Sequence, residues 1–77
     1  MGVATTVHVA LVDEDVEVWR PVLAEHLHGH TYRIAAQEYD AAVERWEFEP
    51  GEVVVCELRR TSEGDMLVAK RKASPQG

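Results

Sequence analysis

The sequence contains few of the residues that usually stabilise a small domain or carry out chemistry. Its 77 residues include one cysteine and five aromatic side chains. A single cysteine excludes an internal disulfide, the common covalent stabiliser of small secreted domains, and this absence favours a reducing, cytoplasmic environment. Because aromatics are scarce among the 45% of residues that are hydrophobic, the core must consist mainly of valine, leucine and alanine. Such a chain fills one small domain and no more.

Long apolar runs and catalytic motifs are absent as well. No stretch approaches the roughly 18 consecutive apolar residues of a membrane span. No basic residue precedes the first apolar run, which soon meets an acidic segment, so no signal peptide is predicted. Gly29, Gly51 and Gly64 are isolated and form no phosphate-binding loop. We therefore predict a protein that is not an enzyme, requires no cofactor and does not enter a membrane.

Basic residues are scarce over most of the chain. Residues 1–58 hold twelve acids against three arginines, a balance of −9, whereas residues 59–77 hold five bases against two acids, a balance of +3. An acidic body repels phosphate backbones at long range, so it disfavours nucleic acid as a partner and favours a basic protein. The densest acidic patch consists of Asp13, Glu14, Asp15 and Glu17.

The sequence does contain a repeated alternation of apolar and polar residues, which is typical of β-strands. The alternation predicts a flexible segment at residues 1–6, a disordered tail at 74–77, and strands over residues 7–12, 16–27, 31–36, 52–60 and 66–71. Pro21 has no amide hydrogen, so the second strand should lie at a sheet edge there or carry a bulge. Gly29 and Gly64 predict tight turns after the second and fourth strands.

Residues 39–46 interrupt the alternation. Asp40 precedes good helix formers and can cap them, but the segment is too short for a stable helix, so one short helical turn or an irregular loop is predicted. A corner from Trp46 to Gly51 then leads into the most β-prone run. Five strands with this single excursion predict an all-β fold, a five-stranded antiparallel small barrel over residues 7–73, because closure hides the sheet edges of a short chain.

Two segments resemble a known type of barrel. Residues 48–54, Phe-Glu-Pro-Gly-Glu-Val-Val, resemble the corner of SH3-like small barrels, and residues 16–22 resemble a segment of short uncharacterised bacterial proteins that we place in that class. The resemblance extends over residues 7–73 and implies a binding or regulatory module rather than an enzyme. The chain lacks the Ala-Leu-Tyr-type segment that accompanies binding of proline-rich peptides by SH3 domains, so that ligand is not implied.

A partner-binding surface is predicted from aromatic and charged side chains. Trp19 has the parity opposite to the apolar residues of its strand, and Tyr39 and Trp46 border the irregular loop, so all three are candidate surface anchors. For at least one tryptophan the core is the alternative. The two glutamates that flank Phe48 can be a catalytic pair, but the polar side of an alternating segment is favoured. The predicted partner-binding residues are Trp19, Arg20, Tyr39, Trp46, Glu47 and Glu49.

The sequence thus favours a non-enzymatic module that binds another protein and exists as a monomer or a weak homodimer. Two other functions stay open. The acid excess of residues 1–58 predicts, as one alternative, an inhibitor that imitates DNA, of the kind that phages and mobile elements encode. The other alternative is a barrel associated with nucleic acid, since small barrels often bind it through aromatics in a basic groove. Its contacts would be Arg59, Arg60, Lys70, Arg71 and Lys72.

Histidine and cysteine are the remaining candidates for chemistry. His26, His28 and His30 are spaced for a shared metal on one face of an extended strand, but the turn expected at Gly29 breaks that geometry. An exposed, pH-sensitive hairpin is favoured over a metal site. Cys56 lies in the most β-prone run and is predicted to be a buried, unreactive thiol.

Overall fold

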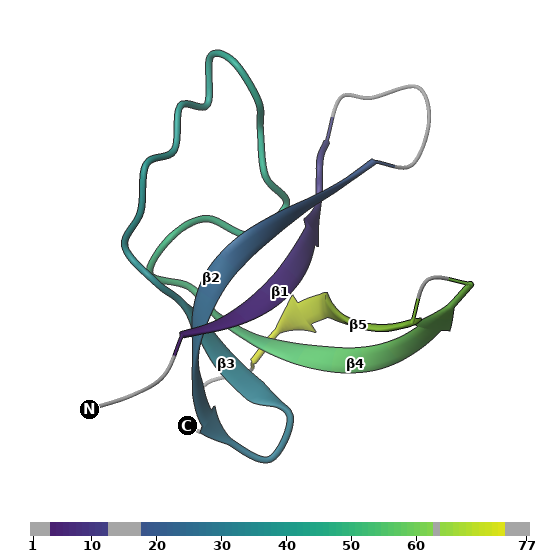
Figure 1. Cartoon of the computed structure of the whole chain (residues 1–77). Coiled ribbons are helices and arrows are strands. Elements are labelled where there is room, and N and C mark those ends of the chain that lie inside the picture. Colours follow the sequence, from purple (N-terminus) through teal and green to yellow (C-terminus); the bar gives the residue numbers. More distant parts are fainter. Residues whose placement is uncertain (1–3, 13–17, 63, 74–77) are drawn as a thin grey trace.

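Five β-strands, arranged in sequence order, form a closed barrel (Figure 1). The computed structural model describes residues 4–12, 18–62 and 64–73. The all-β class and the predicted number of strands are confirmed. The first strand takes in residues 4–6, which the sequence pattern assigns to a flexible segment. The strands are β1 (Ala4–Ala10), β2 (Trp19–His28), β3 (Thr31–Ile34), β4 (Val53–Thr61) and β5 (Gly64–Lys72).

The pair of strands that closes the barrel corrects the prediction of a fully antiparallel sheet. Every pair of consecutive strands is antiparallel, but β1 and β5 run parallel, with His8 beside Val68. The reason is parity. Direction alternates from strand to strand in such a barrel, so the first and fifth strands point the same way, and an odd number of strands cannot close with antiparallel pairs alone.

The core takes side chains from all five strands and from the loop between β3 and β4. Alternate residues of β1, β2 and the first half of β4 are buried, as period-two geometry requires, whereas the neighbours Val68 and Ala69 of β5 are both buried. Most of these side chains are small, and Trp46 and Phe48 of the loop supply the bulk, with only 7% and 5% of their surfaces exposed. The buried cluster consists of Val7, Val9, Val22, Ala24, Ile34, Trp46, Phe48, Val54, Cys56 and Ala69.

The first half of β2 has a paired strand on one side only, because pairing with β3 begins at Ala24. On the open side, Leu23 donates its amide hydrogen to Gln37 Oε1 at 3.0 Å and accepts a bond from Gln37 Nε2 at 2.8 Å. The carbonyl of Leu23 also accepts a bond from the amide of Ala35 at 3.0 Å, so the side chain of Gln37 extends the pairing of β2 beyond the end of β3. Pro21 lies two residues earlier and faces the same side, where no ladder needs its missing amide hydrogen. This confirms the predicted edge position of Pro21.

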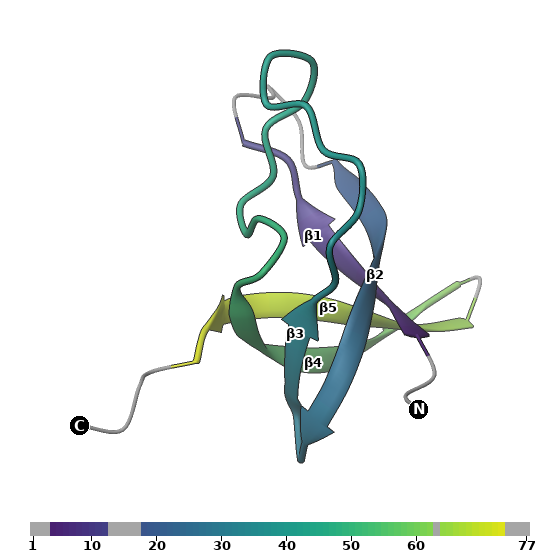
Figure 2. The same cartoon turned by 90° about the vertical axis from the view of Figure 1, so that its left-hand side faces the viewer.

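Residues 35–52 form a long excursion that rises from one end of the barrel (Figure 2). In its first tight turn, the carbonyl of Asp40 accepts bonds from the amides of Val43 and Glu44, each at 3.0 Å, and in its second the amide of Glu52 donates to the carbonyl of Glu49 at 3.1 Å. Asp40 Oδ1 also accepts a bond from the amide of Ala42 at 3.0 Å. The predicted short turn with its Asp40 cap is therefore present.

The returning limb of the excursion pairs with the end of β1. Leu11 forms an isolated antiparallel bridge with Trp46. The amide of Val12 donates to the carbonyl of Arg45 at 2.9 Å, and the amide of Glu47 donates to the carbonyl of Ala10 at 2.8 Å. This pairing turns the Trp46 ring into the barrel. Within the described part of the chain, no helix is long and apolar enough to cross a bilayer.

Candidate protein-binding site

Glu44 connects the excursion to the start of β2. Its carboxylate accepts bonds from Arg20 Nε at 2.7 Å and from Trp46 Nε1 at 2.9 Å, and the Arg20 guanidinium adds a second, parallel bond. The bonds from Arg20, and then from Trp46, lower the pKa of Glu44 to about 2. A bidentate pair of this kind is the strong form of a carboxylate–guanidinium contact. Glu44 is therefore ionised near neutral pH and holds the excursion against the barrel.

Tyr39 packs on Trp46 from the outgoing limb of the excursion. The two ring centroids are 4.5 Å apart and the rings are tilted by 41°. The Tyr39 hydroxyl accepts a bond from the amide of Trp46 at 3.1 Å and donates one to Glu49 Oε2 at 3.3 Å. These contacts join the two limbs, so the excursion presents a defined surface despite its irregular backbone.

An open hollow of about 570 Å³ lies between the end of β1 and the returning limb. Part of its wall is apolar, from Val12, Ala41 and Trp46. The rest consists of three glutamates and one arginine, so the hollow carries a net negative charge. The charged lining residues are Arg45, Glu47, Glu49 and Glu52.

The three glutamates are engaged to different degrees. Glu52 Oε2 accepts a bond from the amide of Glu49 at 2.9 Å. Glu52 Oε1 is buried and lies 3.3 Å from Lys72 Nζ, close enough for an ion pair but without hydrogen-bond alignment. Among the described residues, nothing bonds to the side chain of Glu47. Glu47 and the remaining lone pairs of Glu49 are therefore available to a ligand.

The structure brings most of the predicted partner-binding residues together but leaves one apart. Arg20, Tyr39, Trp46 and the glutamates Glu47 and Glu49 meet at the excursion. Trp19 does not join them, since its ring lies 5.6 Å from the guanidinium carbon of Arg59 on β4.

Trp46 is not an exposed anchor. Only 7% of its surface is accessible and it belongs to the core, because the bridge to Leu11 directs its ring inward. The exposed Glu47 and Glu49 alternate with the buried Trp46 and Phe48, so they form the polar side of an alternating segment. The predicted acidic patch of Asp13, Glu14, Asp15 and Glu17 lies outside the described residues, and the DNA-imitating alternative that depends on it stays a prediction.

The contacts of His26 and the burial of Cys56 indicate structural roles for these side chains. His26 Nε2 donates to the carbonyl of Gly29 at 2.9 Å and its ring packs on Tyr32, with centroids 4.8 Å apart. Gly29 has a φ of 53°, the turn conformation expected from the sequence. Over residues 4–12, 18–62 and 64–73, no cluster of three or more side chains is arranged to hold a metal. Burial raises the pKa of the Cys56 thiol to about 11.

Three residues of the site were missed by reasoning from the sequence. Glu44 is central to the excursion, but its partner Arg20 is 24 residues away and no local pattern links the two. Val12 was assigned to the first strand only, although it lines the hollow. Glu52 had a usable signal, because it directly follows the corner glycine and extends the row of acids at positions 47 and 49.

Comparisons with known proteins provide no relative from which a function can be transferred. No protein-family model, no curated protein and no solved structure matches the chain. The function is therefore argued from the geometry of the barrel and its surfaces.

Proposed function

We propose that the protein is a non-enzymatic interaction module, built on an SH3-like barrel, that binds a basic segment of another protein. The observation that carries the proposal is the hollow beside Trp46, where three glutamates share a wall with apolar side chains. Arginine and lysine match such a wall, because their aliphatic stems pack on apolar surface while their charged heads pair with carboxylates.

The rigidity of the excursion supports binding. Arg20 and Trp46 hold Glu44, and Tyr39 joins the two limbs, so Glu47 and Glu49 are positioned before a partner arrives. A preorganised site loses less conformational entropy on binding and therefore binds more tightly. The strand order and the corner from Phe48 to Gly51 support the SH3-like assignment, and SH3-like barrels are binding modules.

The lowered pKa of Glu44 favours binding over catalysis. A general acid needs a raised pKa, whereas the pKa of Glu44 is lowered by its hydrogen bonds. Glu47 and Glu49 point outward from an alternating segment, as surface carboxylates do. The proposed place of action is the cytoplasm, where the buried thiol of Cys56 stays reduced.

Fluorescence anisotropy with a labelled arginine–glycine repeat peptide tests the proposal. The unmodified protein should bind the peptide, and the double variant Glu47→Gln/Glu49→Gln should bind at least about tenfold more weakly. This loss follows because a hydrogen bond to a charged group contributes roughly 1.5–3 kcal/mol. The double variant should stay folded, since both side chains are exposed.

A matched control distinguishes binding in the hollow from attraction to the negative charge of the whole protein. The double variant Glu25→Gln/Glu38→Gln also removes two negative charges, from exposed positions that do not line the hollow. It should bind the peptide within about twofold of the unmodified protein, because exposed charges are largely screened. An equal loss in both double variants, or no binding by the unmodified protein, contradicts the proposal.

A further inference from the structure

The β4–β5 hairpin has one face that points away from the core. The register places Glu57 beside Val68 and Val68 beside His8. His8 alternates with Val7 and Val9, which are buried inside the barrel, so His8, Val68 and Glu57 point away from the core, although Val68 itself is fully covered. We call this surface the hairpin face.

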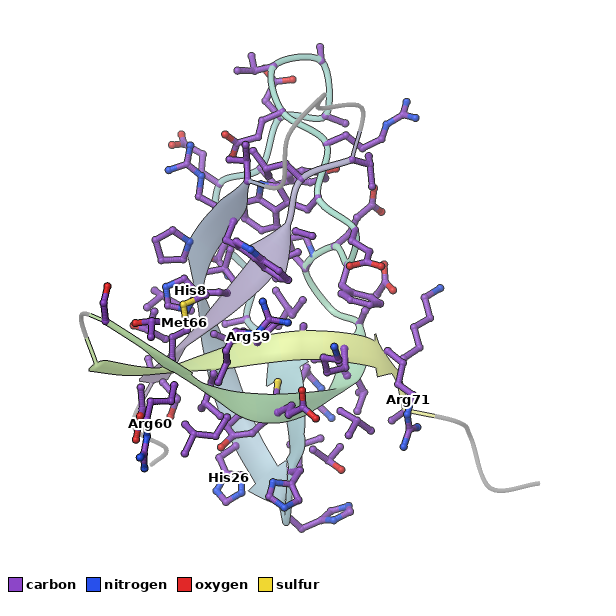
Figure 3. All side chains as sticks on the ribbon, turned by 90° about the vertical axis from the view of Figure 1, so that its right-hand side faces the viewer. His8, His26, Arg59, Arg60, Met66 and Arg71 are labelled. Atoms are coloured by element: carbon purple, nitrogen blue, oxygen red, sulfur yellow. The ribbon has the colours of Figure 1, made fainter. Side chains whose placement is uncertain are left out.

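Arginines stand at both ends of the hairpin face. Residues two apart on a strand share a face, so Arg59 and Val55 lie on the same side as Glu57, and Arg71 joins them as the partner of Val55. Figure 3 shows Arg59 and Arg71 separated along the hairpin. Arg59 and Val55 are four positions apart on β4, which corresponds to about 13 Å along a strand.

An aromatic ring borders the Arg59 end. Trp19 of β2 pairs with Ala10, which has the same outward parity as His8. The guanidinium carbon of Arg59 lies 5.6 Å from the centre of the Trp19 ring. Trp19 is half-buried and the exposed Arg59 lies over its ring, so a planar ligand reaches the ring face by displacing the guanidinium.

A second hollow, of about 450 Å³, opens toward the Arg71 end. It lies at a register shift, since Val55 pairs with Arg71 but the next residue of β4 pairs with Ala69, which leaves Lys70 as an extra residue. His30, Lys70 and Arg71 line the hollow, and Glu57 is its carboxylate, 3.8 Å from Lys70 Nζ. Across the described residues, no carboxylate pairs with Arg71.

We infer that the hairpin face and Trp19 bind single-stranded nucleic acid, at a site separate from the acidic hollow. The phosphate backbone would follow the row of cations from Arg59 to Lys70 and Arg71, and one base would stack on Trp19 in place of the Arg59 guanidinium that lies over the ring. Unpaired bases offer their faces to an aromatic side chain, whereas a duplex keeps them stacked inside, so the Trp19 ring favours a single strand.

The net charge of −6 does not oppose this binding at physiological salt. Charges separated by more than the Debye length of about 8 Å are largely screened, and the molecule measures 33 × 31 × 27 Å. Figure 1 shows the excursion rising from one end of the barrel and the β4–β5 hairpin running across it. Glu57 lies 3.8 Å from Lys70 and Glu52 lies 3.3 Å from Lys72. Among the described residues, Arg59 and Arg71 are not paired with a carboxylate, so they are the cations of the hairpin face that attract a phosphate most.

The test is fluorescence anisotropy with a labelled oligothymidylate of about 12 nucleotides, titrated at several salt concentrations. Binding should weaken with salt with a slope of log K on log salt near about −2, because three cations on a single strand contribute roughly 0.7 each. Arg71→Ala should reduce that slope by about 0.7. Trp19→Leu should lower the affinity at least about fivefold.

Arg60→Ala is the matched control. Arg60 follows Arg59 directly but has the opposite parity, is 89% exposed, and pairs with Asp65 at 3.5 Å. Its removal changes the net charge as Arg71→Ala does, yet it should change affinity less than about twofold. Circular dichroism checks the fold of each variant. If Trp19→Leu unfolds, the comparison of Arg71→Ala with Arg60→Ala still decides the matter.

Four results would overturn the inference: no binding at low salt, an equal loss in Arg60→Ala and Arg71→Ala, tighter binding of a duplex of the same length, and unchanged affinity in a folded Trp19→Leu variant. Arg71→Ala should leave binding of the arginine–glycine peptide unchanged, because Arg71 lies outside the acidic hollow. The two proposed sites can therefore fail independently.

Discussion

The excursion of residues 35–52 and the β4–β5 hairpin are organised in opposite ways. The excursion is acidic, has little regular backbone pairing, and is held by particular side chains, chiefly Gln37, Glu44 and Tyr39. The hairpin is basic and pairs from Val54 to Thr61 with a single register shift after Val55, while most of its tip side chains are exposed. Replacing a single side chain should therefore lower the stability of the protein strongly in the excursion and only slightly at the tip of the β4–β5 hairpin.

Replacement of Trp46 by alanine tests this contrast most severely. Truncation of a buried tryptophan costs about 3–5 kcal/mol, and a folded domain has only roughly 0.05–0.15 kcal/mol of stability per residue. Trp46→Ala should therefore leave much of the protein unfolded, as urea denaturation followed by circular dichroism would show. Trp19→Leu, on the outside of the barrel, is the comparison and should cost about 1 kcal/mol or less. Similar losses in the free energy of unfolding would contradict the assignment of Trp46 to the core and of Trp19 to the outside.

Gln37→Ala should have the next largest effect. It removes the side-chain bonds to Leu23 that extend the pairing of β2, at 2.8 and 3.0 Å. A loss of about 1–2 kcal/mol in the free energy of unfolding is expected, because each hydrogen bond contributes roughly 0.5–1.5 kcal/mol. Gln37→Glu keeps the acceptor and loses the donor, so its midpoint in urea should fall between the other two. A midpoint for Gln37→Ala equal to that of the unmodified protein would contradict this role.

The carboxylate of Glu44 should make the excursion sensitive to acid. Its pKa falls from an ordinary value of 4.5 to about 2 on folding, so the stability it contributes is complete above pH 4.5 and is lost as the pH falls toward 2. Thermal unfolding at several pH values should show a steeper loss below pH 4.5 in the unmodified protein than in Glu44→Gln. The effect should be smaller than that of Trp46→Ala, because solvent screens an exposed pair. If the unfolding temperature falls with pH equally in the two proteins, Glu44 does not cause the acid sensitivity.

The smallest effect is expected at the hairpin tip. Arg60 is 89% exposed and its ion pair with Asp65 spans 3.5 Å, so Arg60→Ala should change the free energy of unfolding by no more than about 0.5 kcal/mol. Calorimetric unfolding temperatures would measure the change. A loss as large as that of Gln37→Ala would mean that side chains stabilise the hairpin too.

Much of the fold could be predicted from local patterns. Alternation located all five strands, and the preference of glycine for positive φ located the β2–β3 turn at Gly29. The cap at Asp40 and the edge position of Pro21 also followed from single-residue chemistry. Strand ends were less accurate, since β3 ends at Ile34, where Gly51 and Glu52 take over its backbone bonds.

The candidate sites were less accessible from the sequence, because they depend on contacts between distant segments. Parity predicted that Glu47 and Glu49 face outward, but it could not show that Val12 and Glu52 join them around one hollow. Parity also placed Trp19 outside the barrel without identifying Arg59, 40 positions later, as its neighbour.

The sequence by itself determined the class of structure: strand-forming alternation, a small aliphatic core and an uneven distribution of charge are properties of neighbouring residues. Tertiary structure alone decided that the barrel closes through a parallel pair, that Trp46 fills the core, and that Arg20 holds Glu44. The physical reason is that burial and pairing depend on which distant segments share the barrel, and the local alternation leaves that choice open.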